Sequence, residues 1–90
     1  SLGGDPHGLL HNWIGLCQLA SGAVVAAERT FATAAEHGLG IAHTNLGICA
    51  VQRGDLATAR RHFATACERA PDDPVARENY AKLCELVPAG

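Results

Sequence analysis

Residues 46–66 read LGICAVQRGDLATARRHFATA, and residues 14–34 read IGLCQLASGAVVAAERTFATA. The two stretches align without a gap at a separation of 32 residues, the distance from Gly15 to Gly47. Identical residues recur at the same places in both, including Gly22 and Gly54, Ala27 and Ala59, Phe31 and Phe63, and Cys17 and Cys49. Internal repetition at this period is typical of stacked supersecondary units. The sequence therefore predicts two copies of one unit.

Glycine, aspartate and proline divide each unit into two helices. Gly54-Asp55 predicts a helix end followed by a helix start, because glycine adopts the left-handed C-terminal cap and aspartate accepts the next helix's unpaired amides. Asp5-Pro6 and Asp73-Pro74 predict starts with proline at the first helical position, where its missing N–H costs nothing. We expect about five helices, at 6–20, 23–37, 40–53, 56–70 and 74–86.

The apolar residues of these helices indicate which faces are buried. Phe31 and Phe63 each belong to a row of alanines spaced three and four residues apart. This spacing puts the row on one helix face, and the small alanines let a neighbouring backbone come close. The first helix carries two apolar stripes instead, Leu10, Ile14 and Cys17 on one face and Leu9, Trp13, Leu16 and Ala20 on the other. A helix that is apolar on two faces is expected to be covered on both.

This pattern resembles the tetratricopeptide repeat family. Residues 40–73 match the family pattern in residue type and spacing at Leu46-Gly47, Ala59, Phe63, Ala66 and Pro71. They depart from it at His43, where the family has an aromatic residue, and at Ala50, where it has Tyr. The first unit, about 8–39, keeps the Gly, Ala and Phe positions but lacks the Pro, and residues 74–88 look like a lone first helix.

The resemblance implies an all-α fold, an antiparallel helix-hairpin array of the α-solenoid type. On this interpretation residues 1–90 are a single domain with repeat one at about 8–39, repeat two at about 40–73 and a capping helix at about 74–88. A chain of 90 residues is also too short for a second domain. Its first residues, Ser1-Leu2 without Met, indicate an excised or processed fragment.

Charge and hydropathy exclude several classes of partner. The net charge is −2, without the basic excess that binds a phosphate backbone, so no nucleic-acid partner is expected. The uncharged run between Asp5 and Glu28 contains His, Asn, Gln and Gly residues, so it is not expected to span or bind a membrane. No basic leader precedes an apolar core, so no signal peptide is visible, although targeting segments could have been removed. The expectation of a cytoplasmic protein rests on the cysteines, which we expect to be reduced.

The sequence contains four cysteines and five histidines, residue types that can form disulfides or bind a metal. The cysteines all fall within expected helices, at Cys17, Cys49, Cys67 and Cys84, so we expect reduced thiols acting as small buried hydrophobes. Paired spacings such as C-x2-C are absent, and no metal or other cofactor is predicted. His11 and His43 occupy the same place in successive units, where we expect them to pack at the junction.

No recognisable nucleophile, base and orienting residue occur together, and no phosphate-binding glycine loop is present, so the chain is not expected to be an enzyme. By resemblance, the first helices line a concave groove. The groove residues this implies are Asn12, Trp13, Leu16, Ile41, Asn45, Ile48, Gln52, Asn79 and Lys82. Asn45 and Asn79 match the asparagine that holds a ligand backbone in peptide-binding members, since a carboxamide offers both a donor and an acceptor.

Lys82 is the lone cation of this set, so a clamp for a C-terminal carboxylate is not expected. The resemblance implies a protein-interaction module that binds a peptide or helical segment of a partner, in a scaffold or chaperone-like role. The alternative is structural. In that case the repeats are a slice of a longer solenoid, and the apolar N-terminal face is covered by neighbouring repeats or by a second copy in a homo-oligomer.

Overall fold

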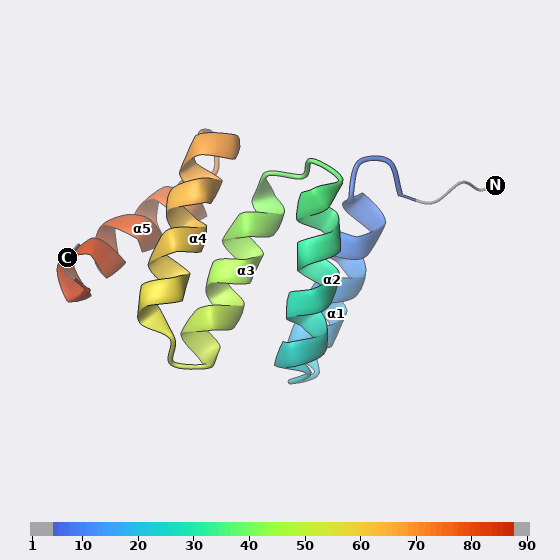
Figure 1. Ribbon diagram of the computed structural model, residues 1–90, viewed down its shortest axis with the longest axis horizontal. Helices are drawn as coiled ribbons and strands as arrows, with labels where there is room; N and C mark the ends of the chain where they lie inside the picture. Colours follow the sequence, from blue (N-terminus) through green and yellow to red (C-terminus); the bar gives the residue numbers. More distant parts are fainter. Residues whose placement is uncertain (1–4, 88–90) are drawn as a thin grey trace.

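The computed structural model describes residues 5–87, which form α-helices joined by short turns (Figure 1). The helices are α1 (Leu9–Ala20), α2 (Val24–Glu36), α3 (Ile41–Gln52), α4 (Leu56–Arg69) and α5 (Pro74–Leu86). The all-α helix-hairpin array is confirmed, and every helix boundary lies within three residues of its predicted position. The Ser1-Leu2 start and residue 88 of the expected capping helix lie outside the described residues.

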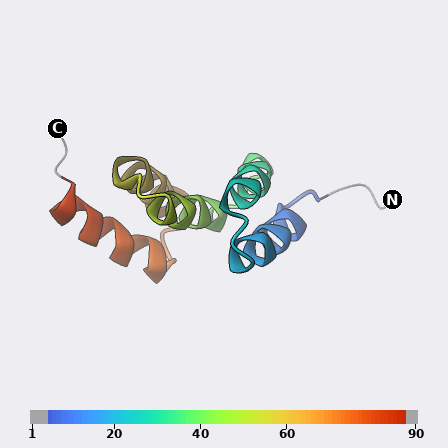
Figure 2. The ribbon, with the colours of Figure 1, turned by 90° about the horizontal axis from the view of Figure 1, so that it is seen from below.

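The helices stack in chain order to form an elongated molecule of 46 × 27 × 19 Å. Each helix packs against the next, and the first helices of successive units also touch, α1 with α3 and α3 with α5. Figure 2 shows α1 and α5 on one side of the molecule, α2 and α4 on the other, and α3 between them. The side of α1, α3 and α5 is therefore concave.

Two phenylalanine rings occupy the core, and each requires a glycine opposite. Phe31 and Phe63 are completely buried, and each lies against the backbone of the preceding helix. A Cβ atom added to Gly15 would lie 2.5 Å from the Phe31 ring, and one added to Gly47 would lie 2.8 Å from the Phe63 ring. Burying each ring contributes roughly 1.5–3 kcal/mol. Gly and Phe recur together because the ring fills the space that a glycine leaves.

Each phenylalanine also joins its hairpin to the next helix. The Phe31 cluster contains Ala27 of α2 together with Leu46 and Cys49 of α3. The Phe63 cluster contains Ala59 of α4, Ala50 of α3 and Leu83 of α5. The core is thus a row of two clusters, each shared between one hairpin and the following helix, as expected for a repeat array.

The turn between α3 and α4 confirms the predicted helix end and start. Gly54 has φ 80°, and its N–H donates to the Val51 carbonyl at 2.9 Å, while the Asp55 N–H donates to the Ala50 carbonyl at 2.9 Å. This pair of bonds is the Schellman motif. The Asp55 carboxylate then accepts the Thr58 N–H at 3.2 Å as the N-cap of α4. Hydrogen bonds from the Thr58 side chain and backbone lower the pKa of Asp55.

The start of α1 differs from the prediction at Asp5-Pro6. The helix begins at Leu9, after Gly8. Residues 5–8 form a turn that folds back over the first turn of α1, and in it the Gly8 N–H donates to the Asp5 carbonyl at 3.2 Å. Asp5 still serves the helix, since its carboxylate accepts the His11 N–H at 2.8 Å. Burial alone would raise the pKa of Asp5, but the hydrogen bonds from His11 and Leu10 outweigh burial and lower it to about 2.

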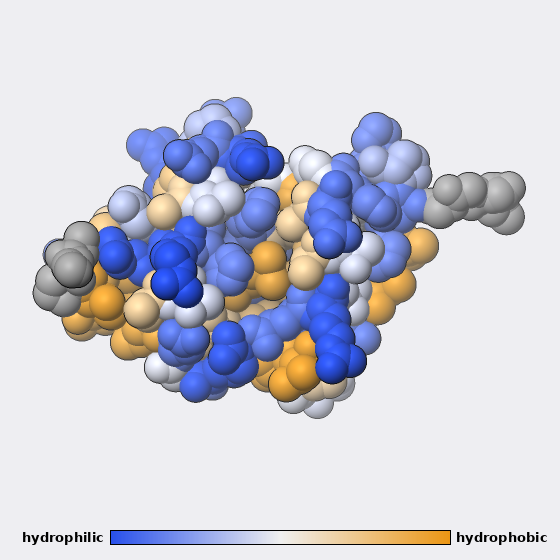
Figure 3. Space-filling model, in the orientation of Figure 1, coloured by the Kyte–Doolittle hydropathy of each residue, from blue (hydrophilic) through white to orange (hydrophobic). Residues whose placement is uncertain are grey.

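Within residues 5–87, neither apolar stripe of α1 is covered by another helix of the chain. The buried residues of α1 are Asn12 and Gly15, which face α2 and α3, whereas Trp13 is 69% exposed and Leu10 55% exposed. The reason is positional, because the described residues place no helix on the outer side of α1. Figure 3 shows the resulting hydrophobic surface at the edge of the molecule beside α1.

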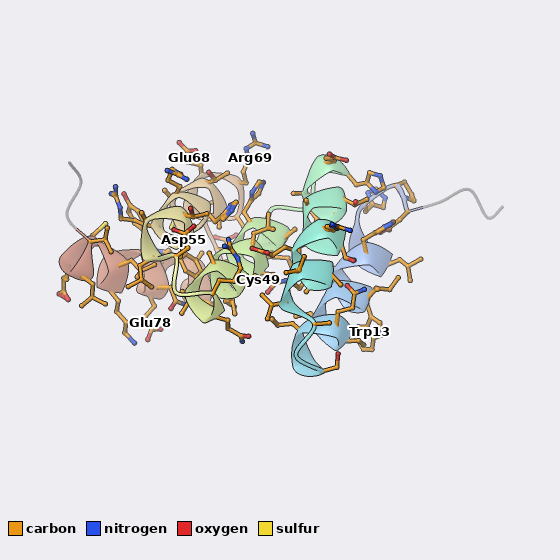
Figure 4. All side chains as sticks on the ribbon, turned by 60° about the horizontal axis from the view of Figure 1, so that its bottom comes forward. Trp13, Cys49, Asp55, Glu68, Arg69 and Glu78 are labelled. Atoms are coloured by element: carbon orange, nitrogen blue, oxygen red, sulfur yellow. The ribbon has the colours of Figure 1, made fainter. Side chains whose placement is uncertain are left out.

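The cysteines are free thiols, as expected, but they are not all buried. Cys49 is completely buried between α3 and α2, and burial raises the pKa of its thiol to about 11 (Figure 4). Cys17 and Cys84 are exposed, which corrects the prediction of four buried thiols. Cys17 occupies the repeat position of Cys49, but the described part of the chain places no helix before α1 to cover it.

Among residues 5–87, no helix combines the length and the apolar character needed to cross a membrane.

Candidate binding groove

A groove of about 310 Å³ opens on the concave side along α3, between α1 and the start of α5. Its lining residues come from all three helices and are Asn12, Leu16, Ile41, Thr44, Asn45, Ile48, Asp73 and Val75. The apolar members among them keep much of their surface open, with exposed fractions of 42% for Leu16, 39% for Ile41 and 46% for Val75. The groove therefore offers apolar side chains to a ligand without any rearrangement of the helices.

A hydrogen bond between two asparagines ties α1 to α3 in the groove. The Asn45 Nδ2 donates to Asn12 Oδ1 at 2.7 Å, and Asn12 is only 8% exposed. This bond uses one amide hydrogen of Asn45. Within residues 5–87 the Oδ1 atom of Asn45 accepts no hydrogen bond. Asn45 can therefore accept a hydrogen bond from a ligand N–H while Asn12 fixes its orientation.

A second polar pair ties α3 to α5. The Thr44 hydroxyl donates to Asp73 Oδ2 at 2.8 Å, and the other oxygen of the same carboxylate accepts the Val75 N–H at 3.0 Å. Asp73 is thus both the N-cap of α5 and a groove residue. Sequence reasoning identified the cap but missed the second role, although Thr44 stands at the repeat position of Asn12 and is likewise buried.

A second hollow of about 260 Å³ lies on α1, lined by Trp13, Leu16, Cys17 and Ala20. Leu16 lines both hollows, so the two adjoin along the concave side. Figure 4 shows Trp13 projecting from α1 away from the helix stack. An indole in this position can close over a bound apolar group, because it has a large surface and few rotatable bonds.

The structure brings together some of the predicted groove residues and separates others. The groove collects Asn12, Leu16, Ile41, Asn45 and Ile48, and the adjoining hollow contains Trp13. Three predicted residues line neither hollow, namely Gln52, Asn79 and Lys82. The Asn79 side chain instead donates to the Val75 carbonyl of its own helix at 2.8 Å. Gln52 and Lys82 are exposed beyond the groove.

Charge in the groove is limited to one carboxylate. Of its lining residues, Asp73 alone is charged at neutral pH, and none is Lys or Arg. A ligand carboxylate would meet no cation there and would be repelled by Asp73. The arrangement suits apolar side chains and N–H donors.

The histidines pack differently from the expectation. The His11 ring lies edge-on to His37, with ring centroids 5.6 Å apart at 88°, and the described residues place no such ring contact between His11 and His43. His43 and His62 are half-buried. Burial lowers the pKa of both, assisted by the charge of Arg69 at His43 and by His43 at His62.

The family model described as tetratricopeptide repeat matches residues 41–83. That stretch contains α3 and α4 and most of α5, the same elements that form the Phe63 cluster. No curated protein and no solved structure matches the chain.

Proposed function

The chain carries a tetratricopeptide repeat, and we propose from this premise that its concave side binds a segment of a partner protein. The tetratricopeptide repeat is a protein-interaction scaffold. The observation that carries the proposal is the groove itself, in which exposed apolar side chains surround an asparagine held in place by its neighbour. Surfaces of this composition usually mark contact sites.

The chemistry of the groove narrows the class of ligand. Leu16, Ile41 and Val75 suit apolar side chains, and Asn45 Oδ1 suits a backbone N–H of an extended segment. Asp73 favours a ligand without negative charge at this point. The proposed ligand is an apolar internal segment of a protein. A C-terminal carboxylate does not fit, and this supports the same expectation drawn from the sequence.

Selection from a random peptide library on the immobilised protein tests this proposal, followed by affinity measurements on variants. Leu16→Lys should weaken binding of the selected peptides at least ~tenfold, about 1.4 kcal/mol, because it places a charge between the two hollows. Val25→Lys makes the same change at an exposed residue of α2 that lines neither hollow, and it should leave the affinity unchanged. Equal losses in both variants, or no selected peptide, would contradict the proposal.

A second candidate function, assembly into a longer array, is favoured by the outer face of α1. Leu10, Ile14 and Cys17 correspond by repeat position to Ala42, Leu46 and Cys49. The three residues of α3 are at most 8% exposed because α2 covers them, whereas their counterparts in α1 are exposed. The face of α1 is therefore suited to a helix like α2, supplied by a preceding repeat or by a second copy.

Sedimentation of the chain at several concentrations separates these two sources. Self-association through this face predicts a mass that rises with concentration in the wild type and remains that of a monomer in Ile14→Arg. A wild-type monomer at every concentration would exclude the second copy and leave a preceding repeat as the proposed cover. The matched control is Val25→Arg, which adds the same charge on α2 and should not alter association.

A further inference from the structure

Three potential metal ligands meet where α1 begins and α2 ends. They are Asp5, His11 and His37, and one ligand atom of each lies within 4.8 Å of those of the other two. The closest pair is His11 Nδ1 and Asp5 Oδ2, at 3.0 Å. Asp5 and His11 are six residues apart, but His37 lies at the end of the next helix, so the short paired spacings sought in the sequence could not reveal the set. The antiparallel packing of α1 on α2 brings them together.

The backbone around this cluster is held in place without a metal. The Asp5 side chain is 7% exposed, and its carboxylate accepts the His11 N–H at 2.8 Å. Gly8 lies directly on the last turn of α2, since a Cβ added there would lie 2.5 Å from the Ala34 carbonyl oxygen. His37 is the C-cap residue of α2. The hydrogen bonds at the start of α1 thus fix Asp5 and His11, whereas the exposed His37 side chain remains adjustable.

The ligand set and its spacing suit zinc. One carboxylate and two imidazoles are common zinc ligands, and tetrahedral bonds of 2.0–2.1 Å place neighbouring ligand atoms roughly 3.3 Å apart. Moving from 4.8 Å or less to that separation requires a modest side-chain rotation. We propose that Asp5, His11 and His37 bind one Zn²⁺ ion, with the fourth position open to water, and that the ion joins the start of α1 to the end of α2.

The other interpretation of the cluster is a capping hydrogen bond with an adjacent histidine. That interpretation accounts for Asp5 and His11, whose contact stabilises the start of α1. It assigns no role to His37, which lies edge-on to His11 at the end of another helix. The two interpretations therefore differ in what they predict for His37. The zinc proposal is independent of the binding groove, because none of the three residues lines it.

Calorimetric titration of the full chain with Zn²⁺, in a background with the exposed thiols replaced (Cys17→Ser and Cys84→Ser), tests the proposal. One ion should bind per chain and raise the Tm, since a ligand that binds the folded state stabilises it. His37→Ala and Asp5→Asn should each weaken binding at least ~tenfold, because losing even a group that only supports a metal ligand costs roughly 10–100-fold in affinity. Asparagine keeps an acceptor for the His11 N–H, so Asp5→Asn should remain folded.

His7→Ala is the matched control, because His7 is exposed at the same end of the molecule but is not part of the cluster. It should bind Zn²⁺ like its parent. Imidazole NMR signals of His11 and His37 should shift on titration, while those of His43 and His62 remain unchanged. The proposal is overturned by absence of Zn²⁺ binding, by unchanged affinity in His37→Ala, or by an equal loss in His7→Ala.

Discussion

Replacing Gly47 by alanine tests the pairing of glycine with phenylalanine that repeats along this chain. The new Cβ would lie 2.8, 2.8 and 2.9 Å from three atoms of the Phe63 ring, where ordinary carbon contacts are about 3.5–4.0 Å. The ring is completely buried among Ala50, Ala59 and Leu83, so it has no open space into which to move. Such overpacking costs about 1–3 kcal/mol. The higher helix propensity of alanine offsets roughly 1 kcal/mol of that cost.

Urea unfolding of a double-mutant cycle separates the steric clash with the Phe63 ring from the higher helix propensity of alanine. In the wild type, Gly47→Ala should lower the free energy of unfolding by up to ~2 kcal/mol. In a Phe63→Leu background the ring is gone, and the same change should stabilise the protein by up to ~1 kcal/mol. The two effects should therefore differ by at least ~1 kcal/mol. If Gly47→Ala stabilises both backgrounds equally, the packing of the Phe63 ring does not require a glycine at position 47, and the proposed pairing of the two residues is refuted.

Three further predictions concern the core, the thiols and the pH dependence of stability. Phe63→Ala should cost about 3–5 kcal/mol by thermal unfolding, whereas Glu78→Ala on the exposed face of α5 should change little, and equal tolerance of both would contradict the core assignment. Without denaturant, Cys49 should react with a thiol reagent far more slowly than the exposed thiols of α1 and α5, because it is buried and its pKa is raised to about 11; equal rates would refute its placement. The pKa of His43 and of His62 lies below the ordinary 6.5 in the folded chain, so the unfolded state binds more protons just below that pH. The contribution of these two rings to stability should therefore be complete above pH 6.5 and decline as the pH falls below 6.5, and an unfolding free energy that stays flat below pH 6.5 would contradict the burial of both rings.

The helices were predictable because their signals are local. Gly54-Asp55 carries the end of one helix and the start of the next within two residues, and the repeat places Phe31 and Phe63 at equivalent positions. The start of α1 was misplaced because Asp5 reaches its helix from outside, through a turn that depends on Gly8. Propensity and spacing carry no information about such a folded-back turn.

The groove was only partly predictable because its polar contacts depend on how neighbouring helices pack. Helix periodicity puts Asn45 on the concave side, but the bond to Asn12 depends on the relative positions of α1 and α3. Asn79 matches Asn45 in the repeat, yet its side chain donates to the Val75 carbonyl of its own helix, and Thr44, the α3 residue at the repeat position of Asn12, donates to Asp73 instead. The exposure of Trp13 has the same origin, since periodicity identifies an apolar face without showing what covers it.

The emission of Trp13, the only tryptophan, tests most directly whether the concave side is an open binding surface. In a dilute monomer without ligand, an indole that is 69% exposed should emit at long wavelength and be readily quenched by iodide. A saturating concentration of a library-selected peptide should shift the emission to shorter wavelength and protect the ring from iodide, because the bound peptide covers it. Covering a large apolar side chain contributes roughly 1.5–3 kcal/mol. An indole that is already blue-shifted and protected in the ligand-free monomer, or that does not respond to bound peptide, would contradict this account.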